Sequence, residues 1–226
     1  MQDTVWEREY RNPQLVTKDE KPQKDTLRFL KFLKKEQGVA LEGLRVLDLG
    51  CGTGRNSNYL AEMGNTVTGF EISQTAIDLA RARAEALGLS AEYSRHDIGA
   101  KYPFDNNTFD LILDVTSSNS LNEKEREVYL AETHRVLKTG GYFFVKTLCK
   151  DGDKNAKELL KKSPGAEPDT YINKDMGLTE RVFSEHDFRA LYSKFHLLHL
   201  EKKTSYTRFK NQSYKRNFWL AYMKNR

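Results

Sequence analysis

The chain has 226 residues, of which 38% are hydrophobic and 31% are charged, and its formal net charge is +5. That length fits one domain with a sizeable core and leaves little room for a second domain. No apolar run approaches the roughly 18 residues of a membrane span and the first residues do not resemble a secretion signal, so we expect a cytoplasmic protein with no membrane partner.

Strand and helix patterns alternate through the first two thirds of the chain. Residues 25–36 (DTLRFLKFLKKE) have apolar side chains near helical spacing, which predicts a helix on the edge of a sheet or over its pocket. Strands are predicted at 44–49, 65–70, 91–95, 109–115 and 141–148, and helices at 55–63, 74–87 and 123–137. Repeated βαβ units predict an α/β fold that is Rossmann-like and doubly wound, with helices on both faces of a mostly parallel sheet.

The pattern changes after residue 149. Residues 150–178 are polar and rich in Gly and Pro, which indicates an insertion over the carboxyl edge of the sheet with one short helix near 154–162. Ser184 is a predicted N-cap, with Asp187 at the capping-box position, for a helix in SEHDFRALYSKF. Two strands follow at 196–201 and 216–223, and the link 202–215 between them is compatible with an antiparallel hairpin. The expected sheet has seven strands, the last of them antiparallel.

A glycine-rich segment, Asp48-Leu-Gly-Cys-Gly-Thr-Gly54, follows the first predicted strand. In an open parallel sheet, ligands bind beyond the carboxyl ends of the strands, where the strand order reverses. Gly50, Gly52 and Gly54 permit positive φ and let the backbone lie directly against a ligand. Glu71 ends the second predicted strand, where a carboxylate can accept hydrogen bonds from both hydroxyls of a ribose.

The glycine spacing separates two classes of nucleoside cofactor. The dinucleotide fingerprint G-x-G-x-x-G, counted from Gly50, would place its third glycine at Arg55, whereas this chain has G-x-G-x-G. Asp48 would repel a pyrophosphate, and it suits a cationic ligand or braces the loop. The segment therefore favours a cofactor without phosphates, and a nicotinamide enzyme remains an alternative that a thermal shift with NADH would test.

From residue 44 to residue 145 the chain resembles the class I S-adenosylmethionine-dependent methyltransferases, and 48–54 is similar to their motif I. The resemblance implies S-adenosylmethionine as cofactor and S-adenosylhomocysteine as product. It implies a ribose contact for Glu71, adenine packing for Ile72, and contacts of Asp97 and Ile98 with the adenine ring and its amino group. Trp6 and Tyr10 are similar to a W-x-x-x-Y element that closes over the cofactor. The predicted cofactor-binding residues are Tyr10, Asp48, Gly50, Cys51, Gly52, Gly54, Asn56, Glu71, Ile72, Asp97, Ile98 and Asp114.

We expect a single methyltransferase domain that is made of four parts. Residues 1–40 form a lid or helix, 41–149 the cofactor-binding core, 150–178 the insertion, and 179–226 the C-terminal helix and hairpin. Residues 54–64 and 180–192 are similar to tellurite-resistance-type methyltransferases and allied small-molecule enzymes. Cys51 and Cys149 have no Cys or His neighbours at metal-ligand spacing, so we expect no metal.

The residues after the fourth predicted strand are the candidates for the acceptor side. Asp114, Ser117, Ser118 and Asn119 lie at the edge where donor and acceptor meet, and an ordinary polar loop is the other interpretation. If the acceptor is a hydroxyl or an ammonium, a general base is needed, and Asp114 is the predicted base.

The identity of the acceptor stays open between three hypotheses. We favour a small molecule. A tRNA acceptor is the alternative, because residues 201–226 hold eight Lys or Arg and one acid, interleaved with Tyr206, Phe209, Tyr214 and Trp219. However, residues 218–223 alternate as a buried strand would. The third hypothesis is a non-catalytic, cofactor-binding interaction subunit, although no obligate protein partner is evident.

Overall fold

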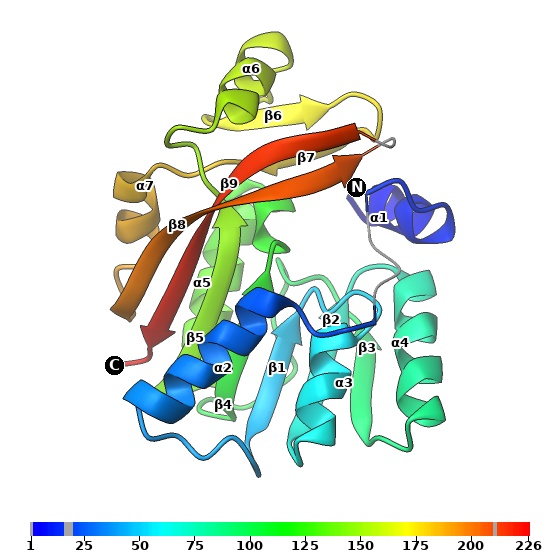
Figure 1. Ribbon diagram of the computed structural model, residues 1–226, viewed down its shortest axis with the longest axis vertical. Helices are drawn as coiled ribbons and strands as arrows, with labels where there is room; N and C mark the ends of the chain where they lie inside the picture. The colour runs from blue at the N-terminus through cyan, green and yellow to red at the C-terminus, as the bar shows by residue number, and fades with distance from the viewer. Residues whose placement is uncertain (1, 16–19, 210–211) are drawn as a thin grey trace.

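The computed structural model describes residues 2–15, 20–209 and 212–226 (Figure 1). Within these ranges the main sheet has seven strands in the order β3-β2-β1-β4-β5-β9-β8. Neighbours among β1 to β5 are parallel, and β9 is antiparallel to both β5 and β8. The strands are β1 (Arg45–Leu49), β2 (Thr66–Glu71), β3 (Ala91–Arg95), β4 (Phe109–Val115), β5 (Leu137–Leu148), β8 (His196–Phe209) and β9 (Gln212–Lys224). The predicted Rossmann-like sheet with its last strand antiparallel is confirmed.

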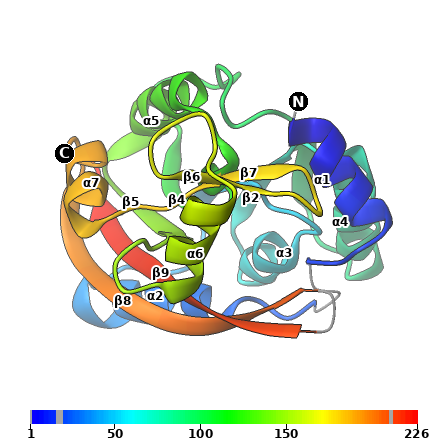
Figure 2. The same cartoon turned by 90° about the horizontal axis from the view of Figure 1, so that it is seen from above.

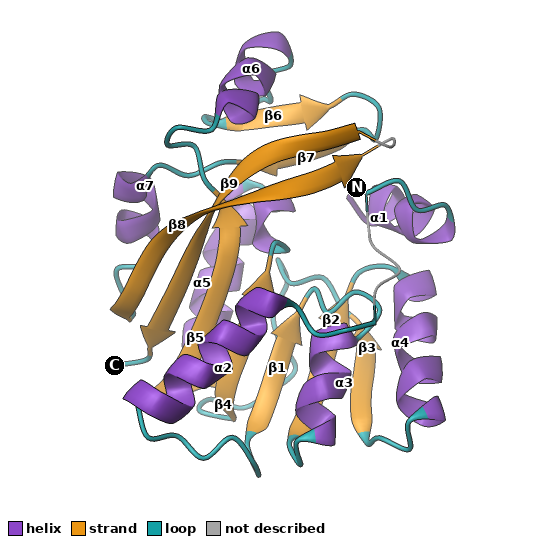
Figure 3. Cartoon of the chain, in the orientation of Figure 1, coloured by secondary structure: helices purple, strands orange, loops and turns teal. Residues whose placement is uncertain are grey.

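Helices cover both faces of this sheet (Figure 3). Apolar side chains of α2 and α3 pack on one face together with Val46 and Phe144, and those of α5 and α7 pack on the other. The helices are α1 (Gln2–Arg11), α2 (Lys24–Glu36), α3 (Arg55–Glu62), α4 (Gln74–Ala86), α5 (Glu123–Val136), α6 (Lys154–Lys162) and α7 (Glu185–Leu191), with a 3-10 turn at Ser118–Ser120. No helix in the described ranges is long and apolar enough to cross a membrane.

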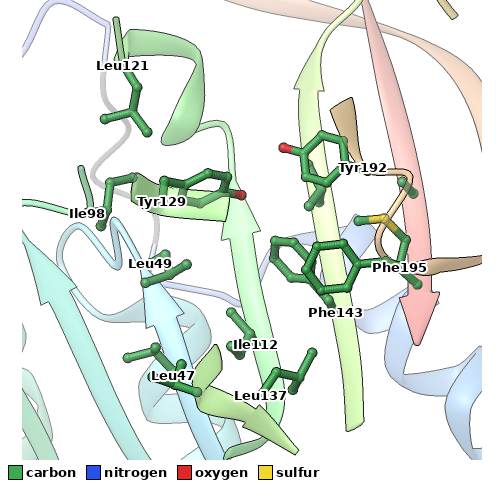
Figure 4. Packing of buried hydrophobic residues seen from close by; sticks show 14 of the residues in the cluster. Leu47, Leu49, Ile98, Ile112, Leu121, Tyr129, Leu137, Phe143, Tyr192 and Phe195 are labelled. Atoms are coloured by element: carbon green, nitrogen blue, oxygen red, sulfur yellow. The ribbon is translucent and has the colours of Figure 1, made fainter. Parts of the chain in front are cut away.

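The core follows from the alternation of side chains along each strand. Leu47 and Leu49 of β1 point to the side of α5, whereas Val46 points to the side of α2 and α3. Tyr129 of α5 and Phe143 of β5 fill the space between α5 and the sheet (Figure 4). Both side chains are fully buried, and burying one such ring stabilises the fold by about 1.5–3 kcal/mol. The two packed faces hold the loops at the carboxyl ends of the strands in place.

The insertion holds more regular structure than its sequence indicates. The predicted short helix is present as α6, but β6 (Thr170–Asn173) and β7 (Leu178–Arg181) also pair as a separate antiparallel sheet. Their turn is closed by a hydrogen bond from the Gly177 N–H to the Asn173 carbonyl (2.8 Å), with Gly177 at φ +72°. The expected helix is therefore confirmed, and the two strands are an addition that the sequence did not predict.

The C-terminal hairpin is also longer than predicted. The expected link 202–215 is mostly strand, because β8 continues to Phe209 and β9 begins at Gln212. Polar residues dominate this stretch because part of the extended hairpin faces solvent, and an antiparallel pair tolerates one solvated face. The helix predicted after Ser184 is α7, which ends at Leu191, and Ser184 caps it by accepting from the Asp187 N–H (3.1 Å).

Candidate functional site

A cavity of about 720 Å³ opens at the carboxyl ends of the parallel strands. Its lower part is formed by the loops after β1, β2, β3 and β4. Its upper part is formed by α1, α6, the β6–β7 sheet and the distal half of the β8–β9 hairpin. Figure 2, which looks onto the carboxyl ends of the strands, shows α6, β6 and β7 crossing above them. The volume is within the range of small-molecule sites.

The glycine loop after β1 forms the floor of this cavity. Gly50 and Gly52 both have positive φ, +69° and +57°, and both line the cavity. A Cβ on Gly50 would lie 2.2 Å from Ser117 Oγ, and one on Gly52 would lie 2.7 Å from the Tyr10 hydroxyl. The loop can therefore lie under Tyr10 and beside Ser117 only without side chains at these positions.

Gly54 has a different place. It is the N-cap of α3, with φ +80°, and a Cβ there would lie 2.7 Å from the Tyr93 hydroxyl and 3.1 Å from Ala80 Cβ. Gly54 is not among the residues that line the cavity. The structure thus gives Gly54 a packing role between the loop, β3 and α4.

Glu71 lies at the end of β2 and is 6% exposed. Its Oε2 accepts from the Gly52 N–H (3.1 Å), and its Oε1 accepts from the N–H groups of Ile72 (2.7 Å) and Ser73 (3.0 Å). Burial raises the pKa of this carboxyl, although the three N–H donors act in the opposite direction. These bonds fix the carboxylate at the cavity wall and still leave lone pairs for a ligand.

Asp48 is the second buried carboxylate at the cavity and is 2% exposed. Its Oδ2 accepts from the Ser57 hydroxyl (2.6 Å). Burial raises its pKa to about 6, and Asp114 and Glu71 add to this effect, whereas Ser57 and Arg55 oppose it. A cation in the cavity would relieve this unfavourable concentration of negative charge.

The other predicted cofactor residues lie around the same floor: Cys51, Asn56, Ile72, Asp97 and Ile98 all line the cavity. Asn56 Oδ1 accepts from the Gln23 N–H (2.9 Å), and Asp97 Oδ1 accepts from the Gly99 N–H (2.8 Å). Burial raises the pKa of the Cys51 thiol well above its usual value. Cys51 is therefore held as the neutral thiol at neutral pH.

Asp114 is not placed as the sequence suggested. It is fully buried and does not line the cavity. Its Oδ1 accepts from the N–H groups of Ser117 (3.0 Å) and Ser118 (3.3 Å), and its Oδ2 accepts from the Tyr129 hydroxyl (2.6 Å). This arrangement corrects the expectation of a general base that meets the acceptor, because Asp114 lies behind the 117–118 backbone and holds that loop in place. Ser117 and Asn119, in contrast, do line the cavity.

The N-terminal helix α1 spans the cavity. Trp6 and Tyr10 line it from this helix. Glu7 fastens α1 to the start of α4, because it accepts from the hydroxyls of Ser73 (2.7 Å) and Thr75 (2.6 Å) and from the Thr75 N–H (3.1 Å). These bonds lower the pKa of Glu7 to about 2, with the Thr75 hydroxyl as the largest cause. No motif around Glu7 predicts this role.

Two other residues of α1 contact the β6–β7 sheet and its turn. Gln2 Nε2 donates to the Thr179 carbonyl (2.9 Å), and the Arg8 guanidinium donates to the Met176 carbonyl. The helix thus joins the cofactor half of the cavity to the inserted sheet. Sequence reasoning did not find these contacts, because their partners are more than 160 residues apart along the chain.

The upper side of the cavity contains residues that sequence reasoning missed. Three strands contribute side chains to it, and we call the following set the strand wall: Lys146, Leu148, Ser205, Tyr214, Arg216 and Phe218. Arg216 donates to Asp153 Oδ2 (3.2 Å) and to the Tyr171 hydroxyl (3.1 Å from both terminal nitrogens). Tyr171 in turn donates to Glu180 Oε2 (2.7 Å) on β7. The alternation of residues 214, 216 and 218 along one strand is the signal that could have found this face.

Comparison with known proteins agrees with this geometry. Residues 46–141 match a family described as "Methyltransferase domain". A "Ubiquinone biosynthesis O-methyltransferase" from Rhizobium leguminosarum is 36% identical over 108 residues, which are 48% of this chain and 42% of that protein. The matched part thus spans less than half of that curated relative. The segment that matches contains the glycine loop, Glu71 and Asp97.

Residues 46–141 are thus similar to a methyltransferase domain.

Solved structures show that the fold similarity extends beyond residues 46–141. A "SAM-dependent methyltransferase" from Methanosarcina mazei superposes with a TM-score of 0.73 at 24% identity, and covers 84% of this chain and 96% of its own. The "1,6-didemethyltoxoflavin-N1-methyltransferase" from Burkholderia thailandensis was solved with 1,6-didemethyltoxoflavin and S-adenosylhomocysteine. Its TM-score is 0.69 at 19% identity, with 99% of this chain and 87% of that chain covered.

The chemistry of the cavity floor fits S-adenosylmethionine, the cofactor that the resemblance implies. S-adenosylmethionine carries a positive charge on sulfur, and the floor holds two buried carboxylates, Asp48 and Glu71, whose pKa values are raised. The glycine loop leaves the floor without side chains at Gly50 and Gly52. Among the described residues no group of three His, Cys, Asp or Glu side chains could hold a metal ion.

Proposed function

We propose that this chain transfers the methyl group of S-adenosylmethionine to a small-molecule acceptor. The observation that carries the proposal is the division of one cavity into two chemically different halves. The floor presents Asp48 and Glu71, which are buried carboxylates, whereas the strand wall presents cations and aromatic rings. A cationic donor and a separate acceptor can thus lie in the same cavity.

Each floor residue has a distinct role in this proposal. Glu71 accepts hydrogen bonds from the ribose hydroxyls, and Ile72 and Ile98 pack on the adenine. Asp97 accepts from the adenine amino group, and Asp48 attracts the cationic end of the cofactor. The exposed backbone of Gly50 and Gly52 allows the close approach that these contacts require.

In this proposal, the chain accelerates methyl transfer mainly by positioning the acceptor and by excluding water. When bound, S-adenosylmethionine supplies a methyl group that is activated by the positive sulfur. Holding an acceptor about 3 Å from a reacting carbon with aligned orbitals can supply a large part of a rate enhancement. α1 lies over the floor through Tyr10, and the β6–β7 sheet crosses above the carboxyl ends of the strands, so both limit the access of solvent to the acceptor. Asp114 serves this positioning by fixing the backbone of Ser117 and Ser118.

The volume of the cavity, about 720 Å³, supports a small acceptor. The curated relative is a ubiquinone-biosynthesis enzyme, and one fold neighbour was solved with a small heterocycle, so small acceptors are also found among similar proteins. The RNA alternative loses one of its aromatic residues, because Trp219 is 4% exposed and its ring N–H donates to the Phe183 carbonyl (2.9 Å). Tyr206 is 70% exposed and remains available, whereas the side chain of Phe209 lies outside the described ones.

Binding and transfer are tested separately. Isothermal titration should show binding of S-adenosylmethionine to the wild type and weaker binding to Glu71→Gln. Incubation with methyl-labelled cofactor and a fractionated cell extract should place label in small molecules. Label in RNA would instead support the tRNA acceptor, and cofactor binding without labelled product would indicate a non-catalytic subunit. No binding at millimolar cofactor would refute the proposal.

A further inference from the structure

A cluster of two lysines and one carboxylate lies at the strand wall. Lys146 Nζ donates to Asp25 Oδ2 (2.9 Å), and Lys203 Nζ donates to Asp25 Oδ1. The Asp25 side chain is 7% exposed, and those of Lys146 and Lys203 are 15% and 31% exposed. Both oxygens of the single carboxylate are engaged, so this cluster carries one surplus positive charge.

The neighbouring charges do not neutralise this surplus. Arg28 pairs with Glu201 through two hydrogen bonds, 2.7 and 3.0 Å long. Arg216 pairs with Asp153. Each of these pairs is balanced in charge, and the lysine cluster is not.

The two lysines of the cluster keep the Asp25 carboxyl ionised. Burial alone would raise the pKa of its carboxyl, but Lys146 and Lys203 together lower it below its usual value. Asp25 therefore stays ionised, and both lysines stay engaged with it.

Of the three residues of this cluster, Lys146 is the one that lines the cavity. Lys146 lies near the carboxyl end of β5, on the same face as Phe144, and it lines the cavity. It pairs in register with Val115 of β4, which also lines the cavity, just before the loop that Asp114 holds. Its ammonium lies 4.6 Å from the centre of the Phe218 ring. A mostly buried ammonium beside an aromatic ring offers an anion a charge-assisted hydrogen bond in a partly desolvated place.

We propose that the acceptor is an organic acid, and that its anionic oxygen binds at Lys146, with the surplus charge of the Lys146–Asp25–Lys203 cluster selecting it. This inference rests on the proposed methyltransferase function and names the class of its acceptor. Phe218 packs against the apolar part of the acceptor. Glu180, the acidic residue on the facing β6–β7 sheet, is held by the Tyr171 hydroxyl, so a second, electropositive group of the acceptor would lie on that side.

The first test is a transfer assay with methyl-labelled S-adenosylmethionine and a small-molecule extract divided by anion exchange at neutral pH. Compounds retained on the exchanger are expected to take up more label than the unretained ones. Equal or greater labelling of the unretained fraction would overturn the inference and leave the methyltransferase function intact. No label in either fraction would remove the proposed function, and this inference with it.

Three variants localise the effect. Lys146→Met and Lys203→Met should each lower transfer to the retained fraction, roughly 10- to 100-fold, while titration shows unchanged cofactor affinity. Lys203→Met keeps the Lys146–Asp25 pair and removes only the surplus charge, so it tests the idea even if Lys146→Met fails to fold. Lys202→Met is the matched control, because Lys202 is exposed and does not line the cavity. Wild-type transfer by Lys203→Met would contradict the assignment.

Discussion

Replacement of Asp48 by asparagine is expected to stabilise the cofactor-free protein at neutral pH and to weaken its binding of S-adenosylmethionine. The side chain is buried, and its pKa is raised from 3.8 to about 6, chiefly by burial. Asparagine has nearly the same shape, and its amide oxygen can still accept from the Ser57 hydroxyl. The substitution therefore removes mainly the charge.

The size of the effect follows from the two pKa values. A carboxyl whose pKa is higher in the folded than in the unfolded state binds more protons when folded. Its contribution to the free energy of unfolding is therefore fully present below the unfolded pKa of 3.8 and is lost as the pH rises through the folded pKa of about 6. The difference between these values corresponds to about 3 kcal/mol at most. Asp48→Asn should escape that loss.

Urea denaturation at about pH 4 and about pH 7.5 measures this difference. The free energy of unfolding of Asp48→Asn, relative to the wild type, should increase by up to about 3 kcal/mol between the two conditions. Asp78→Asn, on the exposed side of α4, is the matched control and should show little change. The same relative stability of Asp48→Asn at both pH values would refute the reasoning.

Although Asp48→Asn should stabilise the cofactor-free protein, it should weaken cofactor binding. A cation beside Asp48 favours the ionised carboxylate, so wild-type affinity for S-adenosylmethionine should fall as the pH drops through about 6. Asp48→Asn should bind the cofactor roughly 10- to 100-fold more weakly at neutral pH and lose this pH dependence. Titration calorimetry across the pH range measures both.

Three further predictions address the loop, the ribose site and the N-terminal helix. Gly50→Ala should destabilise the protein more than Gly38→Ala, because both positions have φ near +68° but only a Cβ on Gly50 would collide with Ser117. Urea denaturation of the two variants isolates the cost of this collision. An equal loss of unfolding free energy in both variants would contradict the prediction. Glu71→Gln should weaken S-adenosylmethionine binding roughly 10- to 100-fold in titration calorimetry, and wild-type affinity would exclude Glu71 from the ribose site. Glu7→Gln should speed hydrogen exchange in α1 with little change in Tm, because it weakens the bonds to the start of α4; unchanged exchange would show that these bonds do not hold the helix.

The central part of the fold could be predicted because its signals are local. Parallel strands such as 44–49 and 109–115 are short apolar runs that end at a glycine or a polar turn. The glycine loop and Glu71 are adjacent to such strand ends, and parallel strands bring those ends to one edge. Proximity of the floor residues therefore follows from topology alone.

The upper half of the cavity depends on long-range pairing, which the sequence does not reveal directly. Arg216 meets Tyr171 from 45 residues away, and Lys146 meets Asp25 from 121 residues away. The stretch 202–215 of the hairpin is mostly polar, so its sequence resembles a solvated link although most of it is strand. For Asp114, the local sequence indicates the wrong environment. Its place at a strand end indicates exposure at the site, whereas Tyr129 and two backbone N–H groups enclose it.

The residues that match the methyltransferase family end before the strand wall begins. Asp48, Glu71 and Asp97 all lie within 46–141, whereas the strand wall lies entirely outside that range. Natural selection can therefore replace the inserted sheet and the hairpin tip, and with them the preference for one acceptor, without altering a residue of the donor half. The α1 helix is the exception, because it touches both halves and must change in step with each.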